Sequence, residues 1–458
     1  MDGTRVEPLT PVGPGTFFTV WSGQLVSVVG TTVTGFGLQI WVYTQTGSVT
    51  SFALVALAFG LPATLISPVA GALVDRWDRR LVMIGADTLA GVSTLAIAAL
   101  FFTGNLQIWH IYLLVGFGSV GNAFQVPAWM ASLPTLVPKR HLARANGMTQ
   151  LIDGVALVLG PAIAGALLFT AGLGAILVLD AVTFVAAVVT LVVVRFPAVS
   201  APSGAETGPS LLDRVRQGWR FIRGRSGLLW LLWIYAAVNF ALAFSNVLIL
   251  PMILSFSDER MAGAIFSAGG IGLLAGGLVM SAWGGPRRRI AAITWGIAVG
   301  GLCLALAGLR PNLLPVGIGV VLLLATVPMV NTASQVLWQV KVPLHLQGRV
   351  FALRRMLAQA ASPVAILLAG PLSDRVFEPL LAEGGPLAGT VGSVIGTGPG
   401  RGIALLVILS GLLTALIGIL GWLHPRVRNV ESELPDTIPD EGSPGRPESV
   451  PGPAAAPG

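Results

Sequence analysis

Long apolar segments alternate with short polar ones along almost the whole chain. We read windows of about 19 residues for apolarity and divided them where charges or Gly and Pro cluster. This gives segments that are each long enough to cross a bilayer as a helix of roughly 20 residues. They cover residues 17–43, 50–74, 81–103, 106–127, 148–171, 174–194, 228–253, 261–283, 290–309, 313–333, 354–375 and 402–423. The pattern predicts an all-α membrane protein with twelve transmembrane helices.

A polar stretch at residues 195–227 divides these segments six and six. It opens with Pro, Ser and Gly, the composition of a flexible linker. Residues 211–222 then place apolar side chains at helical spacing opposite arginines, which predicts an amphipathic helix on the membrane interface. The expected domains are an N-terminal segment 1–16, a first bundle 17–194, the linker 195–227, a second bundle 228–423 and a disordered, Pro- and Gly-rich tail 424–458.

A weak internal repeat relates the two bundles. Pro138–Arg144, after the fourth segment, corresponds in spacing to Pro343–Arg349 after the tenth. Two pseudo-symmetric six-helix halves with a site between them are the layout of many secondary transporters.

Composition and charge agree with a membrane protein. Charged residues make up 10% of the chain and hydrophobic residues 54%, whereas soluble proteins carry about 25% charged residues. The net charge of +7 comes from basic residues in short loops, so we read them as topology signals and lipid contacts and expect no nucleic-acid partner. Of the 27 Lys and Arg residues, 23 lie on one predicted side, which makes both termini cytoplasmic. The excess of Arg over Lys is typical of a GC-rich bacterial genome, so we expect a bacterial plasma membrane.

A charge cluster interrupts the apolar pattern between the second and third segments. It contains Gly71, Asp75, Arg76, Arg79 and Arg80. One interpretation is a cytoplasmic gate, in which carboxylate and guanidinium contacts form in one conformation and break in another. The other is a topology determinant with a helix-capping Asp, worth under about 1 kcal/mol at a wet surface.

Three acids lie well inside predicted segments, namely Asp87, Asp153 and Asp180. Intramembrane carboxylates are costly and mark functional sites by default, so each is a candidate for proton coupling. Asp87 and Asp153 could equally be structural partners of arginines in the gate, and Asp180 could be a packing acid near the outer end. Within the predicted segments of the second half the only acid is Asp374, at the edge of the eleventh segment.

Polar side chains gather on the first, fourth, seventh and tenth segments. Each alone is more often a contact between helices, but together they favour an amphipathic cavity for large, partly apolar substrates. No Lys or Arg is expected in the interior to clamp a carboxylate or phosphate. The candidates for the cavity are Gln24, Ser27, Asn122, Gln125, Asn239, Asn246, Asn331 and Gln335.

Other chemistry is not indicated. The histidines are scattered, Cys303 is the single cysteine, and the chain has neither a phosphate-binding loop nor a nucleophile–base pattern. We therefore expect no metal, no cofactor and no enzymatic activity, with transport driven by an ion gradient.

The loop signature Gly-x-x-x-Asp-Arg-x-x-Arg-Arg at residues 71–80, together with this topology, resembles the major facilitator superfamily up to about residue 424. Two later runs, at residues 127–146 and 342–350, resemble the subgroup of macrolide efflux proteins and siderophore exporters such as the enterobactin exporter. The fifth segment is similar to the Gly-Pro motif of proton-antiporting exporters through Gly154, Gly160, Pro161 and Gly165.

The resemblance implies an exporter that couples protons to the efflux of a hydrophobic or amphipathic small molecule, antibiotic-like or siderophore-like, by alternating access. The implied partners are this substrate, protons and membrane lipids, with the chain acting as a monomer. A lipid flippase and an uptake permease on the same scaffold are alternatives, and the Gly160-Pro161 pair argues against uptake.

Overall fold

We analysed a computed structural model of the chain, which describes residues 14–74, 77–138, 141–194, 211–283, 285–286 and 288–434. These residues form helices and no strand, which confirms the all-α prediction. The first half consists of α1 (Pro14–Thr46), α2 (Val49–Val74), α3 (Arg79–Phe102), α4 (Ile108–Leu136) and α5 (Leu142–Val193). The second half consists of α7 (Ser226–Leu254), α8 (Glu259–Trp283), α9 (Arg289–Gly308), α10 (Leu313–Lys341), α11 (Leu344–Ala360), α12 (Ser362–Leu372) and α15 (Arg401–Leu423).

Eleven helices in the described part of the chain are long and apolar enough to cross a membrane. The longest candidate, Arg144–Val193, is 50 residues long and covers two predicted segments. Gly172 interrupts it with φ 75° and ψ −176°, a backbone conformation that glycine adopts without a steric penalty. The count of twelve crossings remains a prediction, but its fifth and sixth segments do meet at a break.

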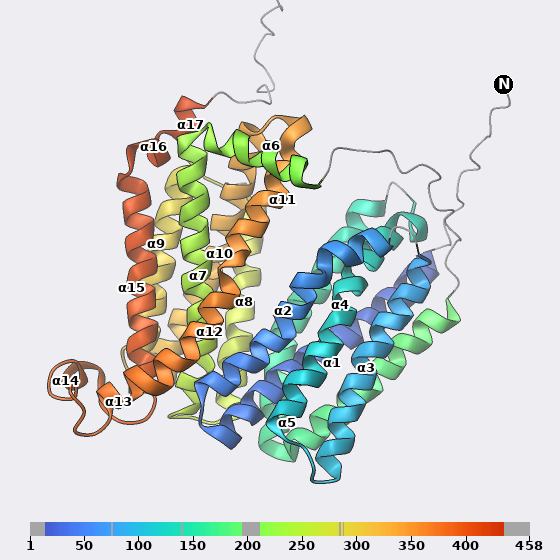
Figure 1. The fold of residues 1–458 in the computed structure, drawn as a ribbon, viewed down its shortest axis with the longest axis horizontal. Helices are drawn as coiled ribbons and strands as arrows, with labels where there is room; N and C mark the ends of the chain where they lie inside the picture. Colours follow the sequence, from blue (N-terminus) through green and yellow to red (C-terminus); the bar gives the residue numbers. More distant parts are fainter. Residues whose placement is uncertain are drawn as a thin grey trace, which may run out of the picture.

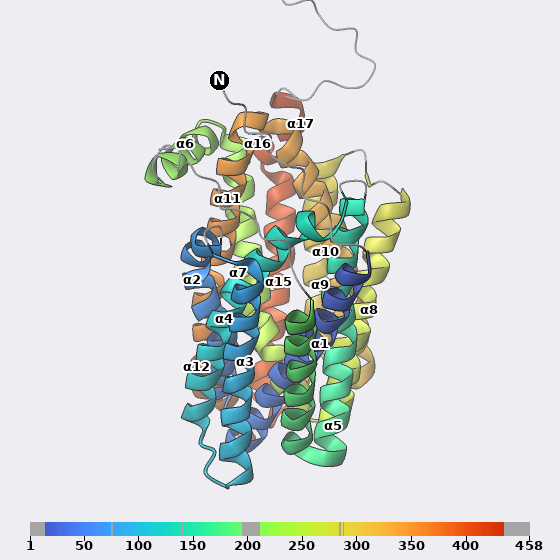
Figure 2. The same ribbon diagram turned by 90° about the vertical axis from the view of Figure 1, so that its right-hand side faces the viewer.

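The two arms of α5 double back along α1. A methyl group on Gly160 would lie 2.5 Å from the Thr32 side chain, and one on Gly30 would lie 2.1 Å from the Thr183 hydroxyl. A straight helix would separate residues 160 and 183 by about 35 Å at about 1.5 Å per residue, yet both lie beside the middle of α1. Figure 2 shows the two arms of α5 joined at the lower end of the molecule.

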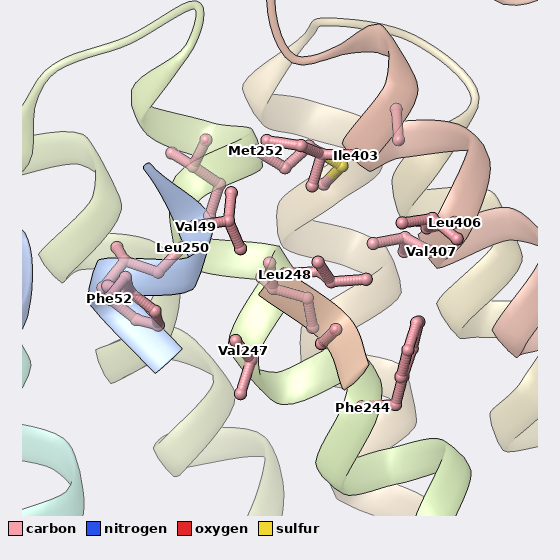
Figure 3. Close-up of a cluster of buried hydrophobic side chains, with 14 of the residues drawn as sticks. Val49, Phe52, Phe244, Val247, Leu248, Leu250, Met252, Ile403, Leu406 and Val407 are labelled. Atoms are coloured by element: carbon pink, nitrogen blue, oxygen red, sulfur yellow. The ribbon is translucent and has the colours of Figure 1, made fainter. Parts of the chain in front are cut away.

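The two halves meet at one end of the molecule. In Figure 1 they lie close where α2 approaches α12, and they diverge toward the end that carries α6 (Leu211–Arg223). The sequence predicts the α6 end to be cytoplasmic, so we call the opposite end the predicted outer end. A hydrophobic cluster at this junction joins Val49 and Phe52 of α2 to α7 and α15 (Figure 3). Burial of this shared apolar surface holds the halves together there.

Close helix packing in the second half depends on glycine. A methyl group on Gly301 of α9 would lie 2.4 Å from the backbone nitrogen of Ala415 in α15, and one on Gly411 of α15 would lie 2.4 Å from the backbone nitrogen of Ala305. At such distances only glycine allows the two backbones to approach. The α9–α15 contact is therefore a backbone-to-backbone contact.

Two predictions about segments outside the membrane have clear outcomes. The predicted helix at 211–222 is present as α6, and Phe221 and Ile222 are buried against the second half. The predicted disorder of 424–458 is wrong for its beginning, which forms α16 (Pro425–Arg428) and α17 (Val430–Glu433). Val427 and Val430 are buried there, and the Lys341 ammonium donates to the carbonyl of Glu431 at 2.6 Å. Residues 435–458 lie outside the described part.

Candidate functional site

A buried carboxylate in the first half is the centre of a polar network. Asp87 of α3 is 8% exposed, and its Oδ2 accepts a hydrogen bond from the Gln24 amide of α1 at 3.2 Å. The Gln125 amide of α4 donates in turn to Gln24 Oε1 at 2.7 Å. A buried polar group is expensive unless it is hydrogen-bonded, and here three helices supply the partners. The network still ends on an open acceptor, because Gln125 Oε1 is buried and has no hydrogen-bond partner.

This network borders a cavity of about 260 Å³ inside the first half. All four cavity candidates from this half, Gln24, Ser27, Asn122 and Gln125, line it. Its apolar wall includes Leu38, Phe59, Ile97, Val115 and Phe184. The cavity therefore combines an apolar wall with hydrogen-bonding groups, as the polar side chains in the sequence suggest.

The three acids occupy different environments. Asp87 and Asp180 both line the cavity, and Asp180 is 6% exposed and accepts a hydrogen bond from the Thr94 hydroxyl at 2.8 Å. Thr94 lies two helical turns beyond Asp87 on α3, so Asp87 and the Thr94 that binds Asp180 are about 10 Å apart along the helix. Asp153 of α5 is exposed and does not line this cavity. From sequence position all three acids were candidates for proton coupling, whereas in the structure only Asp87 and Asp180 of the three line the cavity.

The candidates in the second half are more scattered. Asn239 and Asn331 line a smaller hollow of about 150 Å³, and the Asn239 amide donates to the carbonyl of Tyr235 at 2.8 Å. Asn246 is exposed on α7 and lines neither hollow, while Gln335 accepts a hydrogen bond from Arg354 at 3.3 Å. The predicted single cavity is thus represented by two separate hollows, of which the first is the larger.

The described residues of the predicted gate contact their own half. Arg79 Nη1 donates to the carbonyl of Ala131 in α4 at 2.6 Å. Arg80 donates to the carbonyls of Leu191 and Val192, in the last turn of α5, at 2.7 and 2.6 Å. Cations are favourable at the C-terminal end of a helix, where carbonyls lack partners. A methyl group on Gly71 would meet nothing within 4 Å, and Asp75 and Arg76 lie outside the described residues.

The exporter-like motif of α5 lies at a contact between the halves. A methyl group on Gly165 would lie 2.4 Å from the carbonyl oxygen of Glu259 in α8, and one on Gly263 would lie 2.3 Å from the carbonyl oxygen of Pro161. Gly154 faces Leu274 of α8, while Gly160 faces α1 instead. Three of the four motif residues therefore lie where α5 of the first half crosses α8 of the second.

The sequence analysis missed the surroundings of one half-buried cation, Arg354. Arg354 was placed at the edge of the eleventh segment, but α11 begins ten residues earlier at Leu344. Its guanidinium donates to the Ser334 hydroxyl at 2.7 Å and lies 5.4 and 5.2 Å from the ring centroids of Tyr235 and Trp338. Two aromatic rings and a hydroxyl around an arginine provide cation–π and hydrogen-bond stabilisation. The sequence alone does not show that Tyr235 of α7 and Trp338 of α10 lie next to Arg354.

The chain belongs to the Major Facilitator Superfamily, whose sequence pattern it matches over residues 20–366. It is therefore a multi-pass membrane transporter. It is 27% identical to macrolide efflux protein A of Streptococcus pyogenes over 372 residues, covering 79% of this chain and 90% of that protein. It is 26% identical to the multidrug efflux pump Tap of Mycolicibacterium fortuitum over 376 residues, covering 80% and 91%.

The fold is also similar to that of solved transporters. A bacterial homologue of the human lysosomal transporter Spinster, in an inward-facing and unoccupied conformation, superposes with a TM-score of 0.64. That match covers 88% of this chain and 96% of the other chain at 15% sequence identity.

Proposed function

We propose that this protein is a proton-coupled exporter of hydrophobic or amphipathic small molecules that works by alternating access. It functions as a monomer in the bacterial plasma membrane, with both termini in the cytoplasm and lipids around its apolar surface. The names of its efflux relatives support export. The observation that carries the proposal is the buried Asp87 network on the wall of the first-half cavity.

The chemistry of the cavity favours a substrate with an apolar body and a protonated amine. Asp87 and Asp180 are the charged residues that line it, and both are acidic. An ammonium group would donate to the Asp87 carboxylate and to the open acceptor Gln125 Oε1. Apolar side chains of the wall would contact the part of the molecule next to the amine. A macrolide with an amino sugar has this combination of properties.

Protons and substrate would use the same carboxylate. With Asp87 ionised, the cavity accepts a cationic amine from the cytoplasmic side. Protonation of Asp87 from the outer side removes the negative charge that holds the amine, so substrate is released and the proton is carried inward. The exchange needs a site open to one side at a time, which the divergence of the halves at the α6 end supports (Figure 1).

Asp87→Asn keeps the size and hydrogen-bonding capacity of the side chain and removes its titration. Cells that express this variant should accumulate labelled erythromycin as empty-vector cells do, whereas cells with the unaltered protein should accumulate less until a protonophore is added. The matched control is Asp153→Asn, an acid outside the cavity, which should retain efflux.

Gradient-dependent efflux by Asp87→Asn would contradict this assignment. Loss of efflux in both variants would mean that intramembrane acids in general are needed, not the one in the cavity. If the purified protein moved headgroup-labelled lipid in liposomes and left erythromycin accumulation unchanged, the flippase alternative would replace export. Uptake of erythromycin in place of efflux would support the permease alternative.

A further inference from the structure

A carboxylate of the second half caps a helix of the first half at the predicted outer end. Asp374 lies in the π-helical turn η2 (Ser373–Phe377) that follows α12. It accepts hydrogen bonds from the Ser48 hydroxyl at 2.8 Å, the backbone N–H groups of Val49 and Thr50 at 3.0 and 2.9 Å, and the Thr50 hydroxyl at 2.7 Å. All four donors lie at the start of α2.

Such a cap is normally supplied from within the same chain segment. The first N–H groups of a helix lack partners and carry partial positive charge, and the residue just before the helix usually caps them. Ser48, just before α2, accepts from the N–H of Ser51 at 3.2 Å. The N–H groups of Val49 and Thr50 are instead capped by Asp374, a residue 324 to 325 positions away in the opposite half. The bond therefore forms only when the two halves are together at this end.

The surrounding backbone is shaped for this contact. Gly370, one turn before Asp374, lies so close to α2 that a methyl group on it would be 2.5 Å from Thr50 Cα. The following turn widens into the π-helical η2, a distortion that often occurs at functional sites. Close approach at Gly370 brings the Asp374 carboxylate to the end of α2.

The sequence around Asp374 repeats the first part of the gate signature. Gly370-Pro-Leu-Ser-Asp374-Arg375 has the Gly-x-x-x-Asp-Arg spacing of Gly71-Ala-Leu-Val-Asp75-Arg76. The earlier copy follows α2 at the predicted cytoplasmic end, and the later copy follows α12 at the predicted outer end. The two helices that carry these copies, α2 and α12, also contact each other between the halves.

We propose that Asp374 is an outer latch: its bonds to the start of α2 hold the predicted outer end closed, and they break each time that end opens. This rests on the alternating-access mechanism proposed above. Neutralising Asp374 removes the charge that makes these hydrogen bonds strong, since bonds to charged groups stabilise more than neutral ones. The balance between the two conformations should then shift toward the open outer end.

The test is a distance measurement by pulsed electron paramagnetic resonance on the full-length protein in nanodiscs. Spin labels are placed on Gln45→Cys and Arg310→Cys, exposed positions at the outer ends of the two halves, with Cys303→Ser to remove the native thiol. The short distance should dominate in the unaltered background. Asp374→Asn should raise the ratio of long to short distances by about ten-fold, as expected for the loss of charge-assisted bonds.

Glu378, one helical turn further on, provides the matched control. It accepts hydrogen bonds from the backbone N–H groups of Gly400 and Ile403 at 3.1 and 2.9 Å, so it caps α15 within its own half. Glu378→Gln should leave the distance distribution unchanged. An equal shift in both variants would overturn the latch, because capping in general would then be responsible, and an unchanged distribution in Asp374→Asn would also overturn it.

Thr50→Val covers the case in which Asp374→Asn does not fold. It removes one hydroxyl donor and keeps the backbone bonds, so it should give a smaller shift in the same direction, and no shift would count against the latch. The measurement uses neither substrate nor proton gradient. If Asp374→Asn shifts the distances as expected but the unaltered protein shows no efflux, only the proposed function is contradicted. If the unaltered protein shows efflux but Asp374→Asn leaves the distances unchanged, only the latch is contradicted.

Discussion

The two halves of the molecule bury different kinds of groups. The first half places two carboxylates, Asp87 and Asp180, inside its bundle and around its cavity. In the second half, buried charges occur at helix ends: Lys341 binds the carbonyl of Glu431, and Arg401 binds the carbonyl of Ile395 at 3.1 Å. Buried charges are tolerated where carbonyls or water satisfy them. The interior acids of the first half do not bind helix ends in this way, which agrees with the proposal that protons and substrate act in that half.

Packing sets three helices of the second half apart. More than 60% of the apolar part of α7, α9 and α15 is buried, compared with 39% for α8, 28% for α10, 24% for the span Arg349–Leu381 and 22–44% for the helices of the first half. The glycine contacts between α9 and α15 bring the two backbones into direct contact. We infer that α7, α9 and α15 form a rigid frame against which the first half moves. Three further changes test this contrast, beginning with the largest expected effect.

Gly301→Ala should destabilise the frame most. The added methyl group would overlap the α15 backbone, which cannot move aside as a side chain can. Overpacking of this kind costs about 1–3 kcal/mol, and a backbone contact lies at the upper end. The midpoint of thermal unfolding in detergent should fall. Gly277→Ala in the same half, where a methyl group would meet nothing within 4 Å, should leave it unchanged or raise it slightly; an equal loss in both would contradict the role of close packing.

Arg354→Gln should have an intermediate effect on stability and little on coupling. The change removes the cation between Tyr235 and Trp338 and weakens the bond to Ser334, a loss of about 1–2 kcal/mol. Thermal unfolding measures the loss, and protonophore-sensitive efflux should persist. Arg355→Gln, the exposed neighbour, is the control and should match the unaltered protein. Loss of proton dependence in Arg354→Gln alone would place part of the coupling in the second half.

Gln125→Leu should have the smallest effect and be confined to binding. It removes the donor to Gln24 Oε1, which costs about 0.5–1.5 kcal/mol and weakens substrate affinity by roughly ten-fold or less. Binding of erythromycin to the purified protein, followed by tryptophan fluorescence, measures the change. Asn239→Leu in the smaller hollow of the second half should leave affinity unchanged. The reverse result would assign the substrate to the second half.

Much of the fold could be predicted from the sequence because lipid imposes a simple rule on composition. Any segment that crosses the bilayer must be apolar for about 20 residues, and charges mark its ends. The break at Gly172 was placed correctly between the fifth and sixth segments for this reason. The four cavity candidates of the first half line one hollow. They could be predicted because polar residues inside apolar helices of a bundle turn toward one another and away from lipid.

The remainder depended on contacts that apolarity does not encode. Asp374 looked like a charge at the edge of a segment, and only the fold shows that it reaches a helix more than 300 residues earlier. The segment 424–434 looked too polar to fold alone, but two valines and the Lys341 ammonium hold it against the second half. Arg354 was placed at the edge of a segment because a charge was taken to end a helix, whereas α11 continues through it and a hydroxyl and two aromatic rings contact its guanidinium.

The reversal at Gly172 also determines which surface the protein offers to the outside. One glycine, not a loop, joins the two arms of α5, and Gly174 immediately beyond it is packed against Phe101 and Phe102. A peptide inserted there would have to separate arms that both pack on α1. Antibody epitopes and affinity tags on the predicted outer face therefore belong in the long stretch after α13 (Glu378–Leu381), around the short helix α14 (Val391–Ile395), where the chain offers exposed residues.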